Sequence, residues 1–196
     1  MPKPYIPNDK WSKRAAAEGF RARSVYKLME LDQRFRLIKP GMTVLDIGAA
    51  PGSWLQYTST QVGPEGFVIG IDLQEIKPVA DNVARHKADI TDVEEIKRIL
   101  RKENIETVDL VLSDIAPNTS GVKDVDQWRS VELAQAVMDL GMQLLKPGGS
   151  CVCKIFRGAD FDEFLGKMKL TWSKVGVKTV EASRDRSREV YMVCTK

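Results

Sequence analysis

The sequence predicts an open α/β sheet of mostly parallel strands with helices packed on both of its faces. Short apolar runs alternate with amphipathic segments from Thr43 onwards, and this alternation is typical of β-α units in a parallel sheet. A turn of small residues, Gly48-Ala-Ala-Pro-Gly52, joins the first apolar run to an amphipathic segment. The last two apolar runs have no helix-like segment between them, which predicts an antiparallel hairpin at one edge.

The N-terminal part is expected to be an extended arm followed by two short helices. Residues 1–10 contain three prolines and show no periodicity, so they predict an arm rather than a helix. Residues 11–36 follow a helical pattern, in which Trp11 and Phe20 could lie on one side of the first helix. Pro40-Gly41 ends this segment.

The rest of the chain is divided by its apolar and β-branched runs. Strands are expected at residues 43–47, 67–71, 85–88, 107–113, 149–156, 174–180 and 189–195. Helices are expected at residues 53–62, 76–84, 92–103, 127–145 and 160–170. Asp92 gives one helix a capping start, and Pro147-Gly-Gly149 ends the longest one. Seven strands in one alternating series predict a single domain over residues 1–196.

Composition is that of a globular domain without a membrane span. Hydrophobic residues make up 43% and charged residues 29% of the 196 positions, which is typical of such domains. The chain holds no run of about 18 apolar residues that could cross a membrane, and its N-terminus lacks the apolar region of a secretory signal. We therefore expect a cytoplasmic protein, and we expect it to be a monomer.

The three cysteines fit a reducing compartment better than a disulfide framework. Cys151 and Cys153 lie in one apolar run, so their thiols should share a face of a buried strand. No second cluster of Cys or His supports a metal site, and we predict none. His86, the only histidine, lies in a polar stretch and is expected at the surface.

Positive charge is concentrated in the first fifth of the chain. Residues 1–40 hold ten Lys or Arg and four Asp or Glu, a net charge of +6, whereas the other 156 residues carry a net charge of −3. Such a basic segment suits a polyanion, either a nucleic acid or a membrane surface. We divide the domain into residues 1–40, a basic platform, and residues 41–196, a core of alternating strands and helices expected to hold the functional site.

Acidic residues follow the first four expected strands or lie within them: Asp46, Asp72, Asp89 and Asp114. The carboxyl ends of parallel strands form one edge of an α/β sheet, where such proteins bind ligands. Four acids there are costly without a cation or good donors. The turn lacks the third glycine of the dinucleotide fingerprint and the Gly-Lys-Ser/Thr of a P-loop. S-adenosylmethionine, a sulfonium cation, therefore fits these acids better than an anionic pyrophosphate.

Three further segments bear on the chemistry. Ser113-Asp-Ile-Ala-Pro117 lacks the Pro-Pro-aromatic pattern of enzymes that methylate exocyclic amines, and no cysteine follows a proline as in cytosine C5 enzymes. Lys154 lies inside an apolar strand, where an ammonium is costly unless it is paired. If that strand lies beside the fourth, Lys154 points to the same edge as Asp114. Glu189 opens the last strand after a basic loop.

With these residues in hand, the chain resembles the FtsJ/RrmJ family of ribose 2′-O-methyltransferases. The resemblance covers nearly the whole chain and is carried by Arg23-Ser-Val-Tyr-Lys27-Leu, Val44-Leu-Asp-Ile-Gly-Ala-Ala-Pro-Gly-Ser-Trp54, Asp114-Ile-Ala-Pro-Asn118, Lys154-Ile-Phe-Arg-Gly158 and Ser187-Arg-Glu189-Val-Tyr191. One small departure is Ser53, where glycine is frequent in the family; its neighbours Gly52 and Trp54 are intact.

The resemblance implies a Rossmann-like methyltransferase fold with a catalytic tetrad and a cofactor site. It implies a catalytic tetrad that maps onto Lys27, Asp114, Lys154 and Glu189. It implies contacts to S-adenosyl-L-methionine at Gly52, Trp54, Asp72, Asp89 and Asp114. It also implies RNA as the partner, with a uridine ribose of large-subunit (23S-type) ribosomal RNA as the acceptor and no part for DNA or a membrane.

The chemistry of a ribose hydroxyl agrees with this tetrad. The 2′-hydroxyl is a weak nucleophile and must lose its proton as it attacks the methyl carbon. A lysine accepts a proton only when burial or a nearby cation lowers its pKa, and two lysines converging on one site meet that condition. We assign Lys154 as the base, Asp114 and Lys27 as its positioning partners, and Glu189 as their support. Arg21, Arg23, Arg34 and Arg36 are then expected to contact RNA phosphates.

The sequence leaves three other functions open. A tRNA anticodon-loop ribose methyltransferase would use the same chemistry, although the compact length favours ribosomal RNA. A non-catalytic RNA-binding assembly factor could keep the fold, but the complete tetrad argues against it. A nicotinamide dehydrogenase is disfavoured by the missing glycine pattern.

Overall fold

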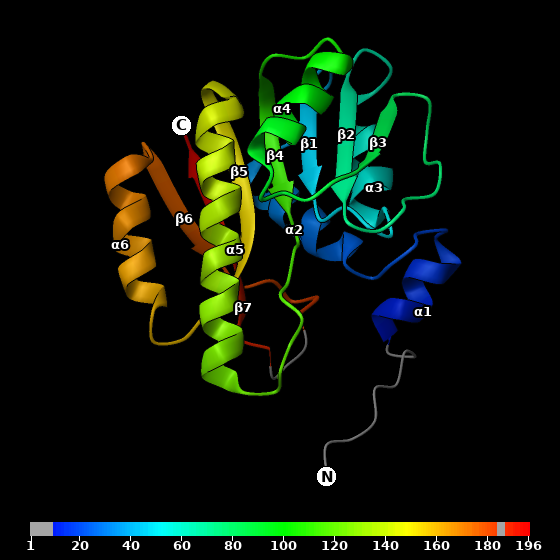
Figure 1. The fold of residues 1–196 in the computed structure, drawn as a ribbon. Coiled ribbons are helices and arrows are strands. Elements are labelled where there is room, and N and C mark those ends of the chain that lie inside the picture. Colours follow the sequence, from blue (N-terminus) through cyan, green and yellow to red (C-terminus); the bar gives the residue numbers. More distant parts are fainter. Residues whose placement is uncertain (1–9, 184–186) are drawn as a thin grey trace.

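The computed structural model describes residues 10–183 and 187–196, and it shows one seven-stranded sheet (Figure 1). The expected arm, residues 1–10, therefore lies almost wholly outside the described residues. All seven expected strands are confirmed: β1 (Thr43–Ile47), β2 (Phe67–Asp72), β3 (Val83–Lys87), β4 (Val108–Ser113), β5 (Leu145–Phe156), β6 (Lys174–Lys178) and β7 (Glu189–Thr195).

The strand order is β3-β2-β1-β4-β5-β7-β6. Strands β1 to β5 pair in parallel, whereas β7 runs antiparallel to both of its neighbours, β5 and β6. The expected antiparallel hairpin is thus confirmed, with β7 inserted between β5 and the edge strand β6. Because β7 runs against the parallel strands, its first residue, Glu189, lies at their carboxyl ends, opposite Phe156.

Two layers of helices cover the sheet, as expected. The helices are α1 (Lys10–Ala17), α2 (Val25–Phe35), α3 (Ser53–Val62), α4 (Val93–Lys102), α5 (Lys123–Leu144) and α6 (Phe161–Thr171). Figure 1 shows α4, α5 and α6 in front of the sheet and α2 and α3 behind it. Each layer has its own apolar core, and these cores contain Phe164 of α6 on one face and Leu28 of α2 on the other. No helix in the described part of the chain is long and apolar enough to cross a membrane.

Alternation along the strands brings the reactive residues to one face. Val44, Leu112 and Val152 all belong to the core under α2 and α3. Side chains two positions apart on a strand point to the same face. Asp46 and Lys154 therefore lie on the α2–α3 face, and Asp114, just beyond β4, follows the same alternation.

Helix α5 begins earlier than expected, at Lys123 rather than at residue 127. The reason is a set of hydrogen bonds from the preceding loop to a side chain inside the first turn, which the sequence pattern did not indicate. The carboxylate of Asp126 accepts the amides of Ser120 (2.6 Å) and Gly121 (3.1 Å), so it orders the loop that enters the helix. Asp124 and Asp126 also place negative charge in the first turn, which the helix dipole favours.

The helix expected at residues 76–84 is wrong, because the chain there is a loop that leads directly into β3. Pro78 prevents a helix from continuing through this segment. The carbonyl groups are satisfied instead by arginine side chains: Arg85 Nη1 donates to Ile76 O (2.8 Å), and Arg21 Nη1 donates to Lys77 O (2.9 Å). Arg21 Nη2 donates to Pro78 O as well.

Arg21 belongs to a set of contacts, here called the linker seam, that joins residues 19–24 to residues 51–56. Arg21 Nη1 donates to Pro51 O (3.0 Å), and its backbone amide donates to Gln56 Oε1 (2.9 Å). Ser24 Oγ lies 3.0 Å from Ser53 Oγ, and Trp54 Nε1 donates to Ser24 O (2.8 Å). The linker seam therefore fixes the segment before α2 against the turn that starts α3.

We predict that Arg21→Ala lowers the free energy of unfolding by about 2–3 kcal/mol, because hydrogen bonds from a charged group each contribute about 1.5–3 kcal/mol and the carbonyls also lose their common donor. The stability of Arg21→Lys should lie between those of the unaltered protein and Arg21→Ala, since one ammonium cannot span the three carbonyls. Urea unfolding measures the effect. The control is Arg34→Ala, an exposed arginine on α2, for which a change within about 0.5 kcal/mol is expected. Equal losses of stability in Arg21→Ala and Arg34→Ala would contradict a stabilising role of the linker seam.

Candidate active site

A cleft of about 440 Å³ opens at the carboxyl ends of the parallel strands. It lies where the strand order reverses between β1 and β4, which is the usual ligand site of an open α/β sheet. Three of the predicted cofactor residues, Asp72, Asp89 and Asp114, line it together with Gly48 and Ile115. The structure thus brings together the acids that the sequence placed at successive strand ends.

The small-residue turn forms one wall of this cleft. Gly48 has a φ of 72°, and a Cβ on it would lie 3.0 Å from Ile115 Cβ, so only glycine fits there without displacing the opposite wall. Asp72 holds the turn: its Oδ2 accepts the amide of Ala50 (2.9 Å), and its Oδ1 accepts the amide of Gln74 (2.7 Å). Each carboxylate oxygen retains a lone pair that a ligand hydroxyl could use.

Asp89 lies at the outer rim of the cleft. Its Oδ1 accepts the backbone amide of Thr91 (2.9 Å) and the Thr91 hydroxyl (2.8 Å). These hydrogen bonds, the backbone one first, lower the pKa of the Asp89 carboxyl, because they stabilise its charged form. Asp89 therefore presents a fixed negative charge to the cleft at neutral pH.

The other two predicted cofactor residues, Gly52 and Trp54, do not line this cleft, but Trp54 lines a small pocket that shares Gly48, Ala50 and Asp114 with it. Gly52 has a φ of 103° and begins α3, and a Cβ on it would lie 2.7 Å from Arg21 Nη1. Trp54 is 3% exposed and packs in the core under α2 and α3. Gly52 lies against Arg21, and Trp54 Nε1 donates to Ser24 O (2.8 Å), so both residues contact the linker seam. Their contacts with the cofactor stay a prediction.

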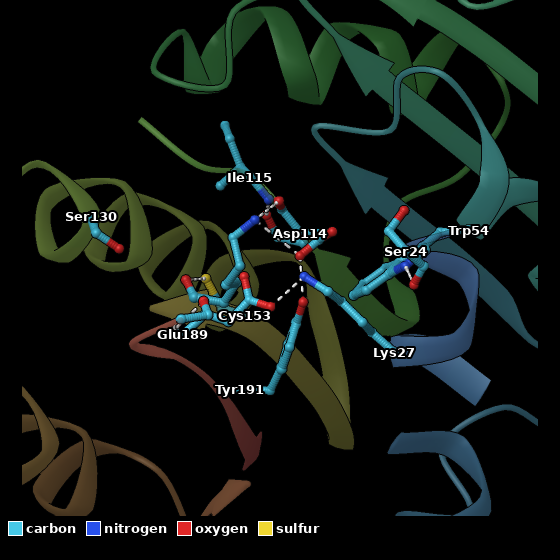
Figure 2. Close-up of polar contacts among 12 residues, drawn as sticks. Ser24, Lys27, Trp54, Asp114, Ile115, Ser130, Cys153, Glu189 and Tyr191 are labelled. Carbon is cyan, nitrogen blue, oxygen red and sulfur yellow. Dashed lines mark hydrogen bonds and ion pairs between the residues drawn. The ribbon is translucent and has the colours of Figure 1, made fainter. Parts of the chain in front are cut away.

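The four tetrad residues come together beside the cleft as two ion pairs. Lys154 Nζ lies 3.0 Å from Asp114 Oδ1 and donates to the backbone carbonyl of Asp114 (2.5 Å). Lys27 Nζ lies 2.5 Å from Glu189 Oε1. Both lysine side chains are almost fully buried, at 8% and 9% exposed. Figure 2 shows one point at which the labelled side chains meet, those of Lys27, Asp114, Glu189 and Tyr191.

Tyr191 is a site residue to which the sequence analysis gave no role. Its hydroxyl donates to Asp114 Oδ1 (2.5 Å), and its ring lies 5.8 Å from Lys27 Nζ. Burial, followed by the negative charge of Asp114, raises the pKa of the Tyr191 phenol, so the phenol stays a donor at neutral pH. The sequence could have pointed to Tyr191 through its spacing from Glu189, since residues two apart on β7 share a face.

The carboxyl of Glu189 stays ionised although it is largely enclosed. Burial on its own would raise the pKa of Glu189, but the Lys27 ammonium, the nearby Ser183 hydroxyl and Lys154 together outweigh burial, so this pKa is lowered. The ion pair with Lys27 is therefore present at neutral pH. No group of His, Cys, Asp and Glu in the described segments has the arrangement of a metal site.

The sheet order, the acid-lined cleft and the lysine pairs define a Rossmann-like methyltransferase. The model of the FtsJ-like methyltransferase family matches residues 20–196. The chain belongs to this family.

Curated relatives and solved structures agree with this assignment. The chain is 44% identical over 190 residues to ribosomal RNA large subunit methyltransferase E of Methylobacillus flagellatus, covering 96% of this chain and 91% of the relative. It is 45% identical over 186 residues to the protein of the same name in Azoarcus sp., covering 95% and 90%.

Among solved structures, a ribosomal RNA methyltransferase from Plasmodium falciparum superposes with a TM-score of 0.78 at 28% identity, covering 90% of this chain and 97% of that one. Aeropyrum pernix fibrillarin, solved with S-adenosyl-L-methionine bound, has a TM-score of 0.59 at 16% identity, covering 81% and 68%. At that identity the fibrillarin likeness concerns the fold alone.

Proposed function

We propose that this protein transfers a methyl group from S-adenosyl-L-methionine to the ribose 2′-hydroxyl of a uridine in large-subunit ribosomal RNA, in the cytoplasm. The observation that carries the proposal is the buried Lys154, held by Asp114 at the edge of an acid-lined cleft. The relatives named ribosomal RNA large subunit methyltransferase E support the choice of acceptor.

The cleft suits a cationic adenosyl cofactor. Asp72 and Asp89 lie towards one end, where carboxylate oxygens can accept the ribose hydroxyls and polar edges of an adenosine. Asp114 lies at the other end, beside both lysine pairs. Bound there, the cofactor supplies a methyl group on a sulfonium sulfur, which leaves as a neutral thioether. A carboxylate-lined wall stabilises such a positive charge.

Lys154 is placed to accept the proton of the acceptor hydroxyl. Two of its N–H bonds are directed at acceptors of a single residue, Asp114 O and Asp114 Oδ1. To act as a base, Lys154 first releases one proton of its ammonium group to solvent. The neutral amine keeps these two bonds, and its lone pair occupies the third direction on the nitrogen. As the 2′-oxygen bonds to the methyl carbon, its O–H bond breaks and the proton passes to Lys154 Nζ. Fixing the base in this way accounts for part of the rate, since orientation can contribute an effective molarity of ~10⁵ M or more.

The remaining residues hold this arrangement. Tyr191 and Lys154 both contact Asp114 Oδ1, so the carboxylate cannot rotate without breaking two contacts. Lys27 comes from α2 and Glu189 from the start of β7, and their ion pair closes the site on the acceptor side. The Lys27 ammonium also carries positive charge from the basic platform into the site, where it can contact the phosphate next to the target ribose.

Four arginines, Arg21, Arg23, Arg34 and Arg36, are expected from the sequence to contact RNA phosphates, and for Arg23 this stays a prediction. Arg21 is occupied by three backbone carbonyls, so it holds the protein together instead of contacting phosphates. Arg34 and Arg36 are exposed at the end of α2. At 1.5 Å per residue, Arg34 lies about 10 Å along the helix from Lys27, within reach of nucleotides next to the target. We therefore propose these two arginines as phosphate contacts.

The double variant Arg34→Glu/Arg36→Glu should bind large-subunit RNA more weakly, with a salt dependence reduced by about 0.7 in log K per log salt for each lost contact. Filter binding across a salt series measures both quantities. The control Lys169→Glu/Lys174→Glu makes the same change in net charge at exposed positions on α6 and β6, and it should leave the slope unchanged. If both double variants reduced the salt dependence of RNA binding equally, net charge would explain the effect, and the proposed platform on α2 would be contradicted.

The acceptor is tested by methylation with tritiated S-adenosylmethionine, using ribosomal subunits and tRNA from a strain that lacks the protein. We expect label in large-subunit RNA, in a single alkali-resistant dinucleotide, as a 2′-O-methyl group requires. Label in tRNA instead would make the protein an anticodon-loop enzyme. No label in either RNA would overturn the proposed activity and favour a binding role.

A further inference from the structure

The start of α5 carries a patch of exposed apolar side chains, far from the buried face of this helix. Val122 precedes the helix, and Val125 and Trp128 lie on its first turns; all three are exposed. Val125 and Trp128 are three residues apart, so they are neighbours on the helix surface. The patch holds three of the five large hydrophobic side chains that are exposed in the described part of the chain. Such clustering marks a contact surface, whereas single exposed apolar residues do not.

Trp128 also lines a groove of about 470 Å³ between α5 and α6, here called the α5–α6 groove. Val131 of α5 and Phe164 of α6 form its apolar walls, and Figure 1 shows the two helices beside each other in front of the sheet. Both helices follow a parallel strand, so the groove starts at the sheet edge that also holds the tetrad. From Val125 to Asp139 the helix rises about 21 Å, at 1.5 Å per residue, which is the length of an extended peptide of about six residues.

The lining of the α5–α6 groove is acidic. One lysine, Lys167, and four acids line it: Glu132, Asp139, Asp160 and Glu163. One positive and four negative charges give a net charge of −3. Lys167 Nζ is already paired with Glu163 Oε1 (2.8 Å). The side chains of Glu132 and Asp160 make no hydrogen bond or ion pair within the part of the chain that the structure describes. These two carboxylates are exposed and free to receive a partner.

Charge and shape together select a basic peptide as the occupant. The acids repel RNA and anionic membrane surfaces. A metal ion or a small amine would leave the apolar length of the groove uncovered. An arginine side chain matches both features, because its guanidinium stacks on an indole face and forms forked hydrogen bonds with carboxylates. Its aliphatic stem can also cover apolar surface such as that of Val125 and Val131.

We propose that the α5–α6 groove binds an arginine-rich segment of a protein that is itself bound to the acceptor RNA. A protein bound to RNA carries basic segments because it neutralises phosphates. The groove starts at the edge of the tetrad, and α2 with its exposed arginines covers the opposite face of the sheet. The enzyme would thus contact RNA on one face and a protein on the other. The identity of this RNA rests on the proposed function, whereas the groove and its charges do not depend on it.

A labelled nonapeptide of three Arg-Ala-Arg repeats tests the groove without RNA, with fluorescence anisotropy as the measurement. We expect Trp128→Ala to weaken binding of this peptide about tenfold, as for an aromatic residue at the centre of an interface. Trp128→Phe keeps an aromatic face and should lose less than about threefold. Glu132→Gln/Asp160→Asn should weaken binding about three- to tenfold, because two exposed ion pairs are lost.

Glu65→Gln/Glu106→Gln is the matched control for charge. Both residues are exposed, in the loops that precede β2 and β4, at the opposite edge of the sheet. The control changes net charge by the same amount and should alter peptide affinity less than about twofold. If both double variants weakened the peptide equally, net charge would explain its binding, and the groove would be overturned as its site.

A second peptide, with lysine in place of every arginine, tests the role of the indole. The unaltered protein should bind the lysine peptide several-fold more weakly, because an ammonium does not stack as a planar guanidinium does. The difference between the two peptides should disappear in Trp128→Ala. Equal affinities of both peptides for the unaltered protein would overturn the choice of an arginine-rich occupant.

Binding to large ribosomal subunits from a strain that lacks the protein tests the partner. We expect Trp128→Ala to bind these subunits about tenfold more weakly by sedimentation, and to bind deproteinised large-subunit RNA with unchanged affinity on filters. Weakening with both would show that the groove contacts RNA, and weakening with neither would show that it is not used; either result would overturn the proposal. No methyl transfer is measured, so these outcomes are independent of the tritium assay of the proposed function.

The remaining alternative occupant is a second copy of this chain, since residues 1–40 carry a net charge of +6. Sedimentation velocity separates the two cases. A monomer, both for the unaltered protein and for Trp128→Ala, supports a different protein as the partner. A dimer that Trp128→Ala converts into a monomer would make the second copy the occupant and would overturn the proposal.

Discussion

Lys154→Ala is expected to lose methyl-transfer turnover by about 10²–10⁴-fold, the usual contribution of a general base. Affinity for S-adenosylhomocysteine should stay within about threefold, because the Asp114 carboxylate keeps its hydrogen bond from Tyr191. Single-turnover methylation of large-subunit RNA measures the chemical step directly. Calorimetry with the cofactor product measures binding, and the two together separate catalysis from cofactor affinity.

Two further variants sharpen this test. Lys146→Ala removes another lysine–aspartate pair between β4 and β5, with Nζ 2.7 Å from Asp109 Oδ1, far from the cleft; it should keep normal turnover. Lys154→Arg keeps the positive charge but cannot give up a proton, so it should be as inactive as the alanine variant. A normal single-turnover rate in Lys154→Ala, or near-normal activity in Lys154→Arg, would remove Lys154 from the role of base.

Trp54→Ala is expected to lower the free energy of unfolding by about 3–5 kcal/mol, the usual cost of truncating a buried large aromatic residue. In a domain of this size the melting temperature should fall by about 10 °C. The reason is that the Trp54 ring fills the core between α2 and the sheet, and its Nε1 donates to Ser24 O (2.8 Å). Thermal and urea unfolding report the change.

The matched variants are Trp54→Phe and Trp128→Ala. Phenylalanine keeps most of the ring but loses the Nε1 donor, so a loss of about 1 kcal/mol is expected. Trp128 is 52% exposed on α5, and its truncation should change stability by no more than about 0.5 kcal/mol. A Trp54→Ala variant that is as stable as Trp128→Ala, yet defective in cofactor binding, would show that the indole contacts the cofactor instead of supporting the turn.

Local patterns were sufficient to place the strands, the acids at their ends and the paired Lys154. Apolar runs of five to seven residues identified β1, β2 and β4, and the acids after them marked the carboxyl edge. A lysine inside an apolar strand predicted a paired residue, and Lys154 does pair with Asp114. These predictions depend on alternation within one strand and on parallel order, both of which are visible in the sequence.

Contacts between distant residues explain what the sequence did not reveal. Residues 76–84 resemble a helix, but their carbonyls are satisfied by Arg21, more than fifty residues earlier in the chain. No window of local sequence contains that partner. Tyr191 reads as an ordinary strand residue until β7 is known to lie beside β5, where it pairs with Lys154. The charge of Arg21 suggested an RNA contact because charge is visible in the sequence, whereas its carbonyl partners are not.

The linker seam also limits how this protein can be recombined with others. The segment that precedes α2 and the turn that precedes α3 share hydrogen bonds through Arg21, Ser24 and Trp54. An RNA-binding segment transplanted from another methyltransferase would therefore disturb the donor site unless the carbonyl and hydroxyl partners were transplanted with it. Under the proposed function, a change of acceptor is therefore more easily made on the exposed end of α2 than by exchange of the whole segment.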